Sequence, residues 1–365
     1  MRADLVVIGA GPAGMAASLA AADLGCEVTL LDGASRVGGQ IYRQSDLPPP
    51  GRQAAPQVGG RLPQRFHRLV DHPRVRWVPE STVWLAERRD GRAFLHATVA
   101  SGQLTLDASV VVVAAGATEI ALPFPGWELP GVTTAGAAQA LLKAQSLPVG
   151  TRVLVAGSGP FLLPVAADLA DAGATVVSVL EATRAAAGAR HGPDLLLHPA
   201  KLGEAAGYAA RLARRGVPVR PGSAVVACHG RDTVERATIA RVDPAWRPVP
   251  GSRRGVDVDA VCVTHGFAPA LELPRALGCA ERRHRAKPVA AVWHDRDQAT
   301  SVPGVFAAGE TTGVGGAQVA ELEGTIAGHA AARHLGRPSA GPPRAVRRRL
   351  AAARRFAGII DRLYP

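Results

Sequence analysis

Two glycine-rich stretches of the chain have residue types that can hold the phosphates of a dinucleotide. The first is GAGPAG at residues 9–14. In such a loop the first glycine allows a tight turn, the second lets the backbone approach a pyrophosphate, and the third lets a helix pack closely on a strand. The N-terminus of that helix then attracts the anion. The expected cofactor contacts here are Gly9, Gly11, Pro12, Ala13 and Gly14.

The residues around this loop predict a strand, a helix and a second strand. A short apolar run at residues 4–9 leads into the loop, an alanine-rich segment follows it, and the strand-like run EVTLLD at residues 27–32 ends in an acid. Asp32 therefore lies about 20 residues beyond the loop, where a carboxylate accepts the ribose hydroxyls of a dinucleotide. Because strand, loop, helix and acid all fit, the segment is predicted to bind a nucleotide.

The second glycine-rich stretch, GSGPFL, begins at Gly157 and keeps part of this pattern. Gly157 and Gly159 match the turn and the close approach, but Leu162 stands where the third glycine is expected. Pro164 removes an N–H group early in the helix. Glu181 ends the next strand and could accept ribose hydroxyls, which favours NAD over its 2′-phosphorylated form. The fold is expected to be kept, and both a working second nucleotide site and an impaired or altered one stay open.

Three further segments have glycines or acids at places where a strand or loop ends. The run SRVGGQIYR at residues 35–43 contains two adjacent glycines, which invite close approach of the backbone to a ligand. A buried strand at residues 108–117 ends in Ala115 and Gly116, and residues 302–331 have the pattern of a strand, an acid, a glycine loop and a helix.

Together these motifs resemble flavoproteins with two dinucleotide-binding domains, the architecture of thioredoxin reductase, over nearly the whole chain. The resemblance implies an α/β fold with two Rossmann-like domains, in which the FAD domain is discontinuous and the NAD-type domain is inserted. It implies that Asp32 binds the adenosine ribose of FAD and that Glu310 binds the ribityl chain. The further FAD contacts that it implies are Gly38, Gly39, Gln40, Ala115, Gly116, Gly309, Ala317, Gln318 and Val319.

The same resemblance places the helix that starts near Ala317 at the pyrimidine edge of the flavin, where its dipole can stabilise negative charge on the reduced cofactor. Two residues depart from the common pattern. Family members commonly have Glu at the position of Asp32 and Asp at the position of Glu310. Both changes keep the charge and alter the reach by one methylene.

A closer resemblance is to the flavoprotein subunits of multi-component amine and imino-acid dehydrogenases. It is carried by the leucine-containing second loop and by residues 39–43, 116–143 and 259–279. That group includes the B subunit of hydrogen cyanide synthase, the A subunit of opine oxidases and the alpha subunit of D-hydroxyproline dehydrogenase. The resemblance implies a hetero-oligomer, in which a separate amino-acid-dehydrogenase-like flavoprotein subunit oxidises the substrate and this chain transfers electrons.

Many members of that group continue into a cysteine-rich segment that binds a [2Fe-2S] cluster, whereas this sequence ends at FAGIIDRLYP. The expectation is therefore that no metal or iron-sulfur cluster is held by this chain and that a small [2Fe-2S] subunit is a possible partner. Cys26, Cys228, Cys262 and Cys279 are widely spaced, so they form no C-x-x-C dithiol and are expected to be buried thiols.

Composition restricts the remaining function classes. The chain has 365 residues, of which 47% are apolar, enough for two medium domains. The net charge of +12 comes almost wholly from scattered arginines with few aromatic residues between them, which disfavours nucleic-acid binding. Glycines and polar residues interrupt every apolar run before it reaches the length that a membrane span needs. Asp4 and the glycine loop argue against a signal peptide, so a cytoplasmic protein is expected.

Proline and glycine near residues 123–127 and 283–288 predict where the chain crosses between domains. The expected domains are 1–118 with 285–365 for FAD, and 119–284 for the second, NAD(P)-type nucleotide. A basic amphipathic helix is predicted at about 344–364, with an apolar stripe that could pack on the FAD domain or meet a partner.

Three function classes compete at this point. The first is the redox subunit of a multi-component amine or imino-acid dehydrogenase, the second a self-contained NAD(P)H-dependent FAD oxidoreductase, and the third a non-catalytic nucleotide-binding scaffold subunit. His191, His198 and His265 could be bases near a flavin, although ordinary polar positions in loops are the simpler interpretation. The catalytic residues and the substrate are not predicted.

Overall fold

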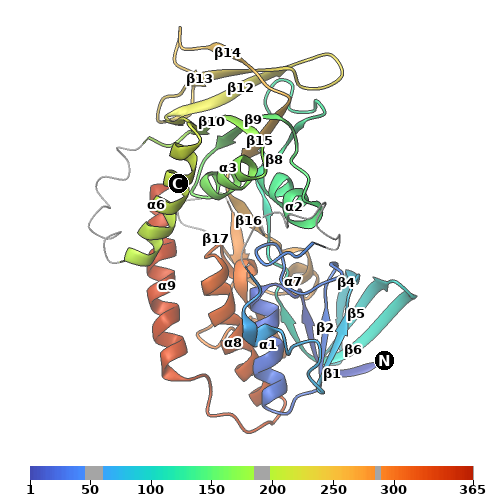
Figure 1. Ribbon diagram of the computed structural model, residues 1–365. Coiled ribbons are helices and arrows are strands. Elements are labelled where there is room, and N and C mark those ends of the chain that lie inside the picture. The colour runs from blue at the N-terminus through green and yellow to red at the C-terminus, as the bar shows by residue number, and fades with distance from the viewer. Residues whose placement is uncertain (46–60, 185–197, 284–288, 365) are drawn as a thin grey trace. The chain divides into compact units, whose positions relative to one another are not determined.

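The computed structural model (Figure 1) describes residues 1–45, 61–184, 198–283 and 289–364, and these form two compact units. The first unit is assembled from three separate stretches of the sequence, which are Met1–Arg43, Gly60–Thr118 and Phe267–Gly358. The second consists mainly of the continuous stretch Glu119–Gly266 and also takes in the end of the chain from Ile359.

The first unit is built on a mixed sheet with the strand order β3-β2-β1-β6-β5-β4 and with β19 beside β6. The parallel part contains β1 (Arg2–Ile8), β2 (Val28–Leu31), β3 (Val75–Val78), β6 (Gly102–Val113) and β19 (Val305–Ala307). The long strand β6 also pairs antiparallel with β5 (Arg92–Val99), which pairs with β4 (Thr82–Arg89). The central strand β2 and the second half of β1 are buried on both faces, as expected where both faces of a parallel sheet are covered.

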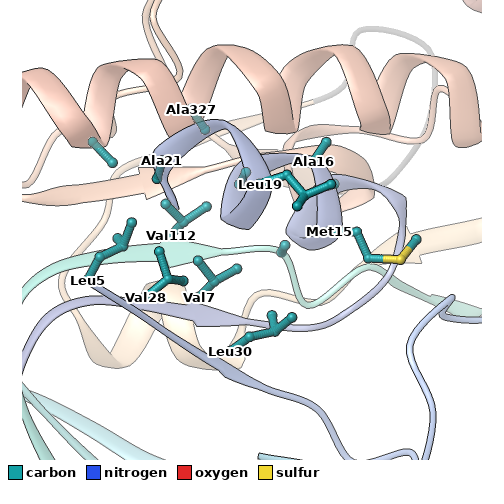
Figure 2. Close-up of a cluster of buried hydrophobic side chains, with 14 of the residues drawn as sticks. Leu5, Val7, Met15, Ala16, Leu19, Ala21, Val28, Leu30, Val112 and Ala327 are labelled. Atoms are coloured by element: carbon teal, nitrogen blue, oxygen red, sulfur yellow. The ribbon is translucent and has the colours of Figure 1, made fainter. Parts of the chain in front are cut away.

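Two helices pack together over one face of this sheet: α1 (Pro12–Asp23) and α8 (Ala317–His334). Their approach is close enough that a Cβ at Gly324 would lie 2.0 Å from Ala13 O, so only glycine fits there. Figure 2 shows the core between helices and sheet. Its labelled side chains are Leu5, Val7, Val28, Leu30 and Val112 from the strands, Met15, Ala16, Leu19 and Ala21 from α1, and Ala327 from α8.

The second unit contains a parallel sheet with the strand order β11-β10-β9-β15-β8. Its strands are β8 (Val132–Thr134), β9 (Arg152–Gly157), β10 (Thr175–Glu181), β11 (Val219–Pro221) and β15 (Ala260–Thr264). Its helices are α2 (Ala135–Gln145), α3 (Leu162–Asp171) and α6 (Pro199–Arg214). A separate antiparallel sheet is formed by β12 (Ser223–His229), β13 (Arg236–Arg241) and β14 (Arg254–Asp257).

The connecting segments show where the chain changes unit. The outward crossing lies at β7 (Ala117–Glu119), and the return lies between Gly266 and Phe267, earlier than the boundary near residue 285 that proline and glycine suggested. The reason is apolar packing after β16 (Phe267–Pro269), since Leu271 and Leu277 are buried in the core of the first unit. The remaining elements are η1 (Gln64–Phe66), α7 (Glu272–Ala276), β17 (Glu281–Arg283), β18 (Ala290–Val292) and η2 (Gly309–Thr312).

The C-terminal helix α9 (Arg344–Leu363) matches the predicted basic amphipathic helix. Leu350 is buried against the α8 residues Leu322 and Ile326, so the first half of its apolar stripe packs on the chain itself. This is the first of the two alternatives that the sequence left open. Arg348 and Arg355 are exposed on α9. Among the described residues, none of the helices combines the length and apolarity needed to cross a membrane.

Candidate cofactor-binding site

The first glycine loop has the geometry of a phosphate loop. Gly9 follows β1 with a φ of 100°, and a Cβ there would lie 2.2 Å from Ala114 O. A Cβ at Gly14 would lie 1.7 Å from Gly9 O, so glycine alone lets α1 pack this closely on the loop. Gly11 is the N-cap of α1 and no side chain caps the helix. The N–H groups in the first turn of α1 have no partner within the helix and are therefore available to an anion.

Asp32 lies at the end of β2 and is oriented by the loop itself. Its Oδ2 accepts a hydrogen bond from Ala10 N at 2.5 Å, and its Oδ1 accepts one from Ala34 N at 2.7 Å. A carboxylate has about four acceptor sites, so two bonds to the backbone leave capacity for ribose hydroxyls. These contacts fix the carboxylate of Asp32 beside the first loop.

The segment around Gly38 and Gly39 lies directly against the first loop. Gly38 N donates to Ala10 O at 2.9 Å, and a Cβ at Gly39 would lie 2.8 Å from Gly11 Cα. The two adjacent glycines thus allow two backbone segments to approach each other where a larger residue would separate them. Gln40, the next residue, is exposed.

The short turn η2 brings the late acid into the same region of the first unit. A Cβ at Gly309 would lie 2.8 Å from Ala13 Cβ, which places the turn beside the first turn of α1. Thr311 Oγ1 accepts a hydrogen bond from Gly116 N at 3.1 Å, so the end of β6 is also joined to the turn. Ala115 precedes this contact and is exposed.

Glu310 lies in this turn, immediately before the glycine loop that leads to α8. Burial raises the pKa of Glu310, the negative charge of Glu323 adds to the increase, and a hydrogen bond from Gly316 N opposes it. Helix α8 begins at Ala317 with Gly316 as an N-cap that has no capping side chain. Gln318 and Val319 complete the start of this helix, and their first-turn N–H groups face no acceptor within the helix.

Sequence reasoning did not identify three residues that hold η2 in place, namely Thr311, Thr312 and Glu323. The available signal was Glu323, because it falls on the side of α8 that carries the buried residues Val319 and Ile326. A carboxylate on a buried helix face needs partners, and this requirement could have pointed to the turn.

The second loop resembles the first at its start and differs at its end. A Cβ at Gly157 would lie 1.7 Å from Thr264 O, which matches the crowding at the first loop. Leu162, however, is 1% exposed and belongs to the core of the second unit together with Val155 and Val165. Helix α3 begins at Leu162 itself. The leucine therefore fills the core instead of obstructing the loop, and Pro164 lies in the first turn, where its missing N–H breaks no helical hydrogen bond.

Glu181 is held by the second loop much as Asp32 is held by the first. Its Oε2 accepts from Gly159 N at 2.9 Å and its Oε1 from Thr183 N at 2.8 Å. Burial raises the pKa of Glu181, and these hydrogen bonds oppose the increase. Nearby, the hydroxyl of Thr264 is buried and has no hydrogen-bond partner among the described residues.

The cysteines and histidines that the sequence suggested show fewer features of a functional site. All four cysteines are free and buried, as predicted, and burial raises the pKa of Cys228 to about 11 and that of Cys262 to about 12. His265 and His198 belong to the second unit, and burial lowers the pKa of His265. His191 lies outside the described residues. No group of His, Cys, Asp and Glu in the described ranges could hold a metal ion.

The residues of the first unit fit FAD. The approach of Gly39 to Gly11 leaves no space for a Cβ at Gly39, and the start of α1 offers N–H groups to a pyrophosphate. Asp32 and Glu310 supply two acids beyond the ends of β2 and β19. These features suit a ligand with a pyrophosphate and hydroxyl groups on both sides of it.

The sequence model of the family described as Pyridine nucleotide-disulphide oxidoreductase matches residues 3–324. The chain belongs to this family. Its members are FAD/NAD(P) oxidoreductases, so the chain is assigned to an enzyme class that works with a flavin. The predicted family and enzyme class are confirmed.

Curated relatives extend this result over almost the whole chain. The A subunit of opine oxidase from Agrobacterium tumefaciens (strain Ach5) is 35% identical over 378 aligned positions, which cover 99% of this chain and 72% of the relative. The hydrogen cyanide synthase subunit HcnB of Pseudomonas aeruginosa is 31% identical over 373 positions, covering 98% of this chain and 77% of the relative. The expected similarity to these two proteins is confirmed.

Solved structures show the same fold at lower identity. The L-proline dehydrogenase from P. horikoshii has a TM-score of 0.66 at 17% identity and covers 96% of this chain and 59% of its own. The T. acidophilum thioredoxin reductase has a TM-score of 0.64 at 20% identity and covers 92% of this chain and 97% of its own. The predicted α/β fold with two dinucleotide-binding domains is confirmed.

Proposed function

We propose that this chain is the FAD-binding electron-transfer subunit of a hetero-oligomeric dehydrogenase that acts on an amine or imino acid of the opine, hydroxyproline, proline or glycine type. The observation that supports this function is the near full-length similarity to proteins that are themselves named as subunits, of opine oxidase and of hydrogen cyanide synthase. In this proposal the first unit binds FAD, and Gly157, Gly159 and Glu181 of the second unit are the residues at which a second nucleotide, NAD(P) or another, would bind.

Bound FAD would supply the redox centre, and the chain's own residues would bind and orient it. The start of α1 would hold the pyrophosphate, Asp32 the adenosine ribose, and Glu310 the ribityl hydroxyls. The start of α8 at Ala317 would place the positive end of a helix dipole beside the cofactor, where it stabilises negative charge.

The cysteines support electron transfer over disulfide exchange. A thiol must ionise to act as a nucleophile. Because burial raises the pKa of Cys262 to about 12 and that of Cys228 to about 11, neither thiol is ionised near neutral pH. The proposed partners follow from the similarity to proteins named as subunits: a flavoprotein subunit related to amino-acid dehydrogenases, which would oxidise the C–N bond, and a small [2Fe-2S] subunit that would accept electrons.

The test is anaerobic reduction of the purified, FAD-loaded chain. We expect the flavin absorbance to stay when proline, hydroxyproline, glycine or an opine is added to the chain alone, and to bleach when the amino-acid-oxidising subunit is also present. Rapid oxidation of one of these substrates by the isolated chain would contradict the proposal.

The carboxylate of Glu181 and the two glycines that the second loop keeps favour one alternative, a self-contained NAD(P)H-dependent FAD oxidoreductase. Rapid bleaching by NADH or NADPH without a partner would support that alternative. Flavin that stays oxidised even in the assembled complex with substrate would indicate a scaffold subunit with a structural nucleotide.

A further inference from the structure

A buried carboxylate on α8 holds the turn that carries Glu310. Glu323 is 2% exposed, and its Oε2 accepts a hydrogen bond from Gly309 N at 2.9 Å. The same oxygen lies 2.8 Å from Thr312 Oγ1. One carboxylate oxygen thus contacts the first and the last residue of η2. Arg282 Nη2, which donates to Thr312 O at 2.6 Å, and the bond from Gly116 N to Thr311 also hold the turn, but of the described residues only Glu323 bonds to both of its ends.

The charge of this carboxylate is matched from α9. Arg354 donates to Glu323 Oε1 through Nε at 3.1 Å and through Nη2 at 2.8 Å. Gln298 is fully buried beside this pair, and the amide orientation that satisfies its neighbours puts its nitrogen 3.0 Å from Ala307 O and its oxygen 3.2 Å from Arg354 Nη2. Arg354 therefore connects α9 with Glu323 on α8 and with Gln298, which reaches the strand just before the turn.

Loss of the arginine would leave an uncompensated charge in the interior. Glu323 is buried whereas the side chain of Arg354 is 41% exposed, so the cost falls on the carboxylate, which would stay desolvated without its partner. Here the remaining charge would also face Glu310, whose pKa is already raised in part by Glu323. Since a Cβ at Gly309 would lie 2.8 Å from Ala13 Cβ, the turn has little space in which to relax toward α1.

We propose that Arg354 of the C-terminal helix is a positioning residue for FAD: through Glu323 it fixes the turn that presents Glu310 to the ribityl chain, without touching the cofactor. The inference rests on the proposed FAD site. It assigns to α9 a role in binding the middle of the cofactor. The adenosine end would be held by α1 and Asp32, and none of the hydrogen bonds described above joins these to Glu323 or Arg354.

The experiment compares FAD with ADP, which lacks the ribityl chain and the flavin. The dissociation constant of FAD is measured by flavin fluorescence on the apoprotein. The affinity of ADP is measured by its competition with FAD, so that only ADP bound at the first loop is detected. In Arg354→Met we expect FAD to bind about tenfold more weakly, the loss typical of a hydrogen bond to a charged group, while the competition constant of ADP stays within about twofold. Arg355→Met, at the exposed neighbouring position, should match the wild type for both ligands.

Two further variants separate charge from general stability. Arg354→Lys keeps the charge with fewer donors and should recover part of the FAD affinity. Glu323→Gln combined with Arg354→Met removes the unpaired charge but keeps an acceptor for Gly309 N, so its FAD affinity should return to within about threefold of the wild type. The double variant also serves if Arg354→Met alone does not fold.

Equal weakening of FAD and ADP in the arginine variant would overturn the inference, because it would show a general loosening of the first unit. Unchanged FAD affinity in Arg354→Met would overturn it as well. A wild-type chain that binds ADP but not FAD would contradict the proposed function itself, and this result is visible before any variant is made.

Discussion

The two glycine loops differ at their sixth position, where the first unit has Gly14 and the second has Leu162. In the first unit α1 begins at Pro12 and packs against the loop, whereas in the second α3 begins two residues later in the motif, at Leu162. Both units keep the strand, the crowded first glycine and the acid. The comparison shows that the fold tolerates leucine at the position of the third glycine, and that the helix there begins two residues later in the motif.

The acids of the two loops also bond to different positions of the motif, and the position in the second unit is again the later one. Asp32 bonds to Ala10, the second residue of its loop, while Glu181 bonds to Gly159, the third residue of its loop. A side chain that is longer by one methylene reaches one residue further along the backbone. Each acid therefore bonds to the residue of its own loop that its side chain can reach.

The largest effect is expected when the first loop is given the residue of the second. In Gly14→Leu the new Cβ would lie 1.7 Å from Gly9 O, so α1 must move away from the loop. We expect a destabilisation of about 3 kcal/mol and loss of the yellow colour of the purified protein. Urea denaturation and flavin absorbance measure the two effects, and a yellow, equally stable variant would show that the glycine is dispensable.

The reverse exchange, Leu162→Gly, tests whether the leucine impairs nucleotide binding. Because Leu162 is 1% exposed within the core of the second unit, its removal should leave a cavity and destabilise the protein by about 3 kcal/mol. The start of α3 does not depend on the side chain alone, so we expect no gain in NAD affinity in calorimetric titration. A tighter NAD complex with little loss of stability would mean that the leucine blocks the site.

The two acids offer a selective test with a smaller effect. Asp32→Asn should weaken FAD binding by about tenfold, because a charged acceptor for the ribose is lost while one backbone bond can be kept. Glu181→Gln, the matched change in the second unit, should leave FAD affinity unchanged. Fluorescence titration of both variants with FAD decides this, and a loss of FAD affinity in Glu181→Gln would contradict the assignment of FAD to the first loop.

The smallest expected signal concerns the thiols, one or more of which lie in each unit. With the pKa of Cys262 raised to about 12, its thiol stays protonated up to high pH and reactivity should appear only as the pH approaches that value or the protein unfolds. Alkylation is measured by mass spectrometry. We expect none in the native protein at pH 8 and full alkylation in denaturant. Rapid labelling of the folded chain would show that a cysteine is accessible.

Local patterns were sufficient to predict the geometry of the first glycine loop and of the acid beside it, which are continuous in sequence. The spacing of Gly9, Gly11 and Gly14, with Asp32 after them, predicts the close approach of Gly14 to Gly9 and the place of Asp32 beside the loop, which both arise within one strand, helix and strand. Glu323 could not be predicted in the same way, because its partners Gly309 and Arg354 lie 14 and 31 residues away and only packing brings them together.

The sequence was also insufficient to predict the location of the Leu162 side chain and the point where the chain returns to the first unit. A leucine at a glycine position indicates that something differs, but whether the side chain enters the loop or the core depends on where α3 starts. Likewise, proline and glycine near residue 285 are a local sign of a linker, while burial of Leu271 and Leu277 in the first unit is a tertiary effect that overrides it.

The division of the first unit into three stretches of sequence has a consequence for how the protein is made. Strands β1 and β2 leave the ribosome early, but β19 and α8, which complete their sheet and cover α1, follow after nearly the whole second unit has been synthesised. At about 5–20 residues per second, the apolar face of α1 waits on the order of 15–60 s for its partner helix. The continuous second unit can fold during this interval, so the nascent N-terminal segment depends on chaperones or on its own solubility in the meantime. A ribosome-bound chain stalled before β19 should accordingly retain no FAD, however complete its first glycine loop already is.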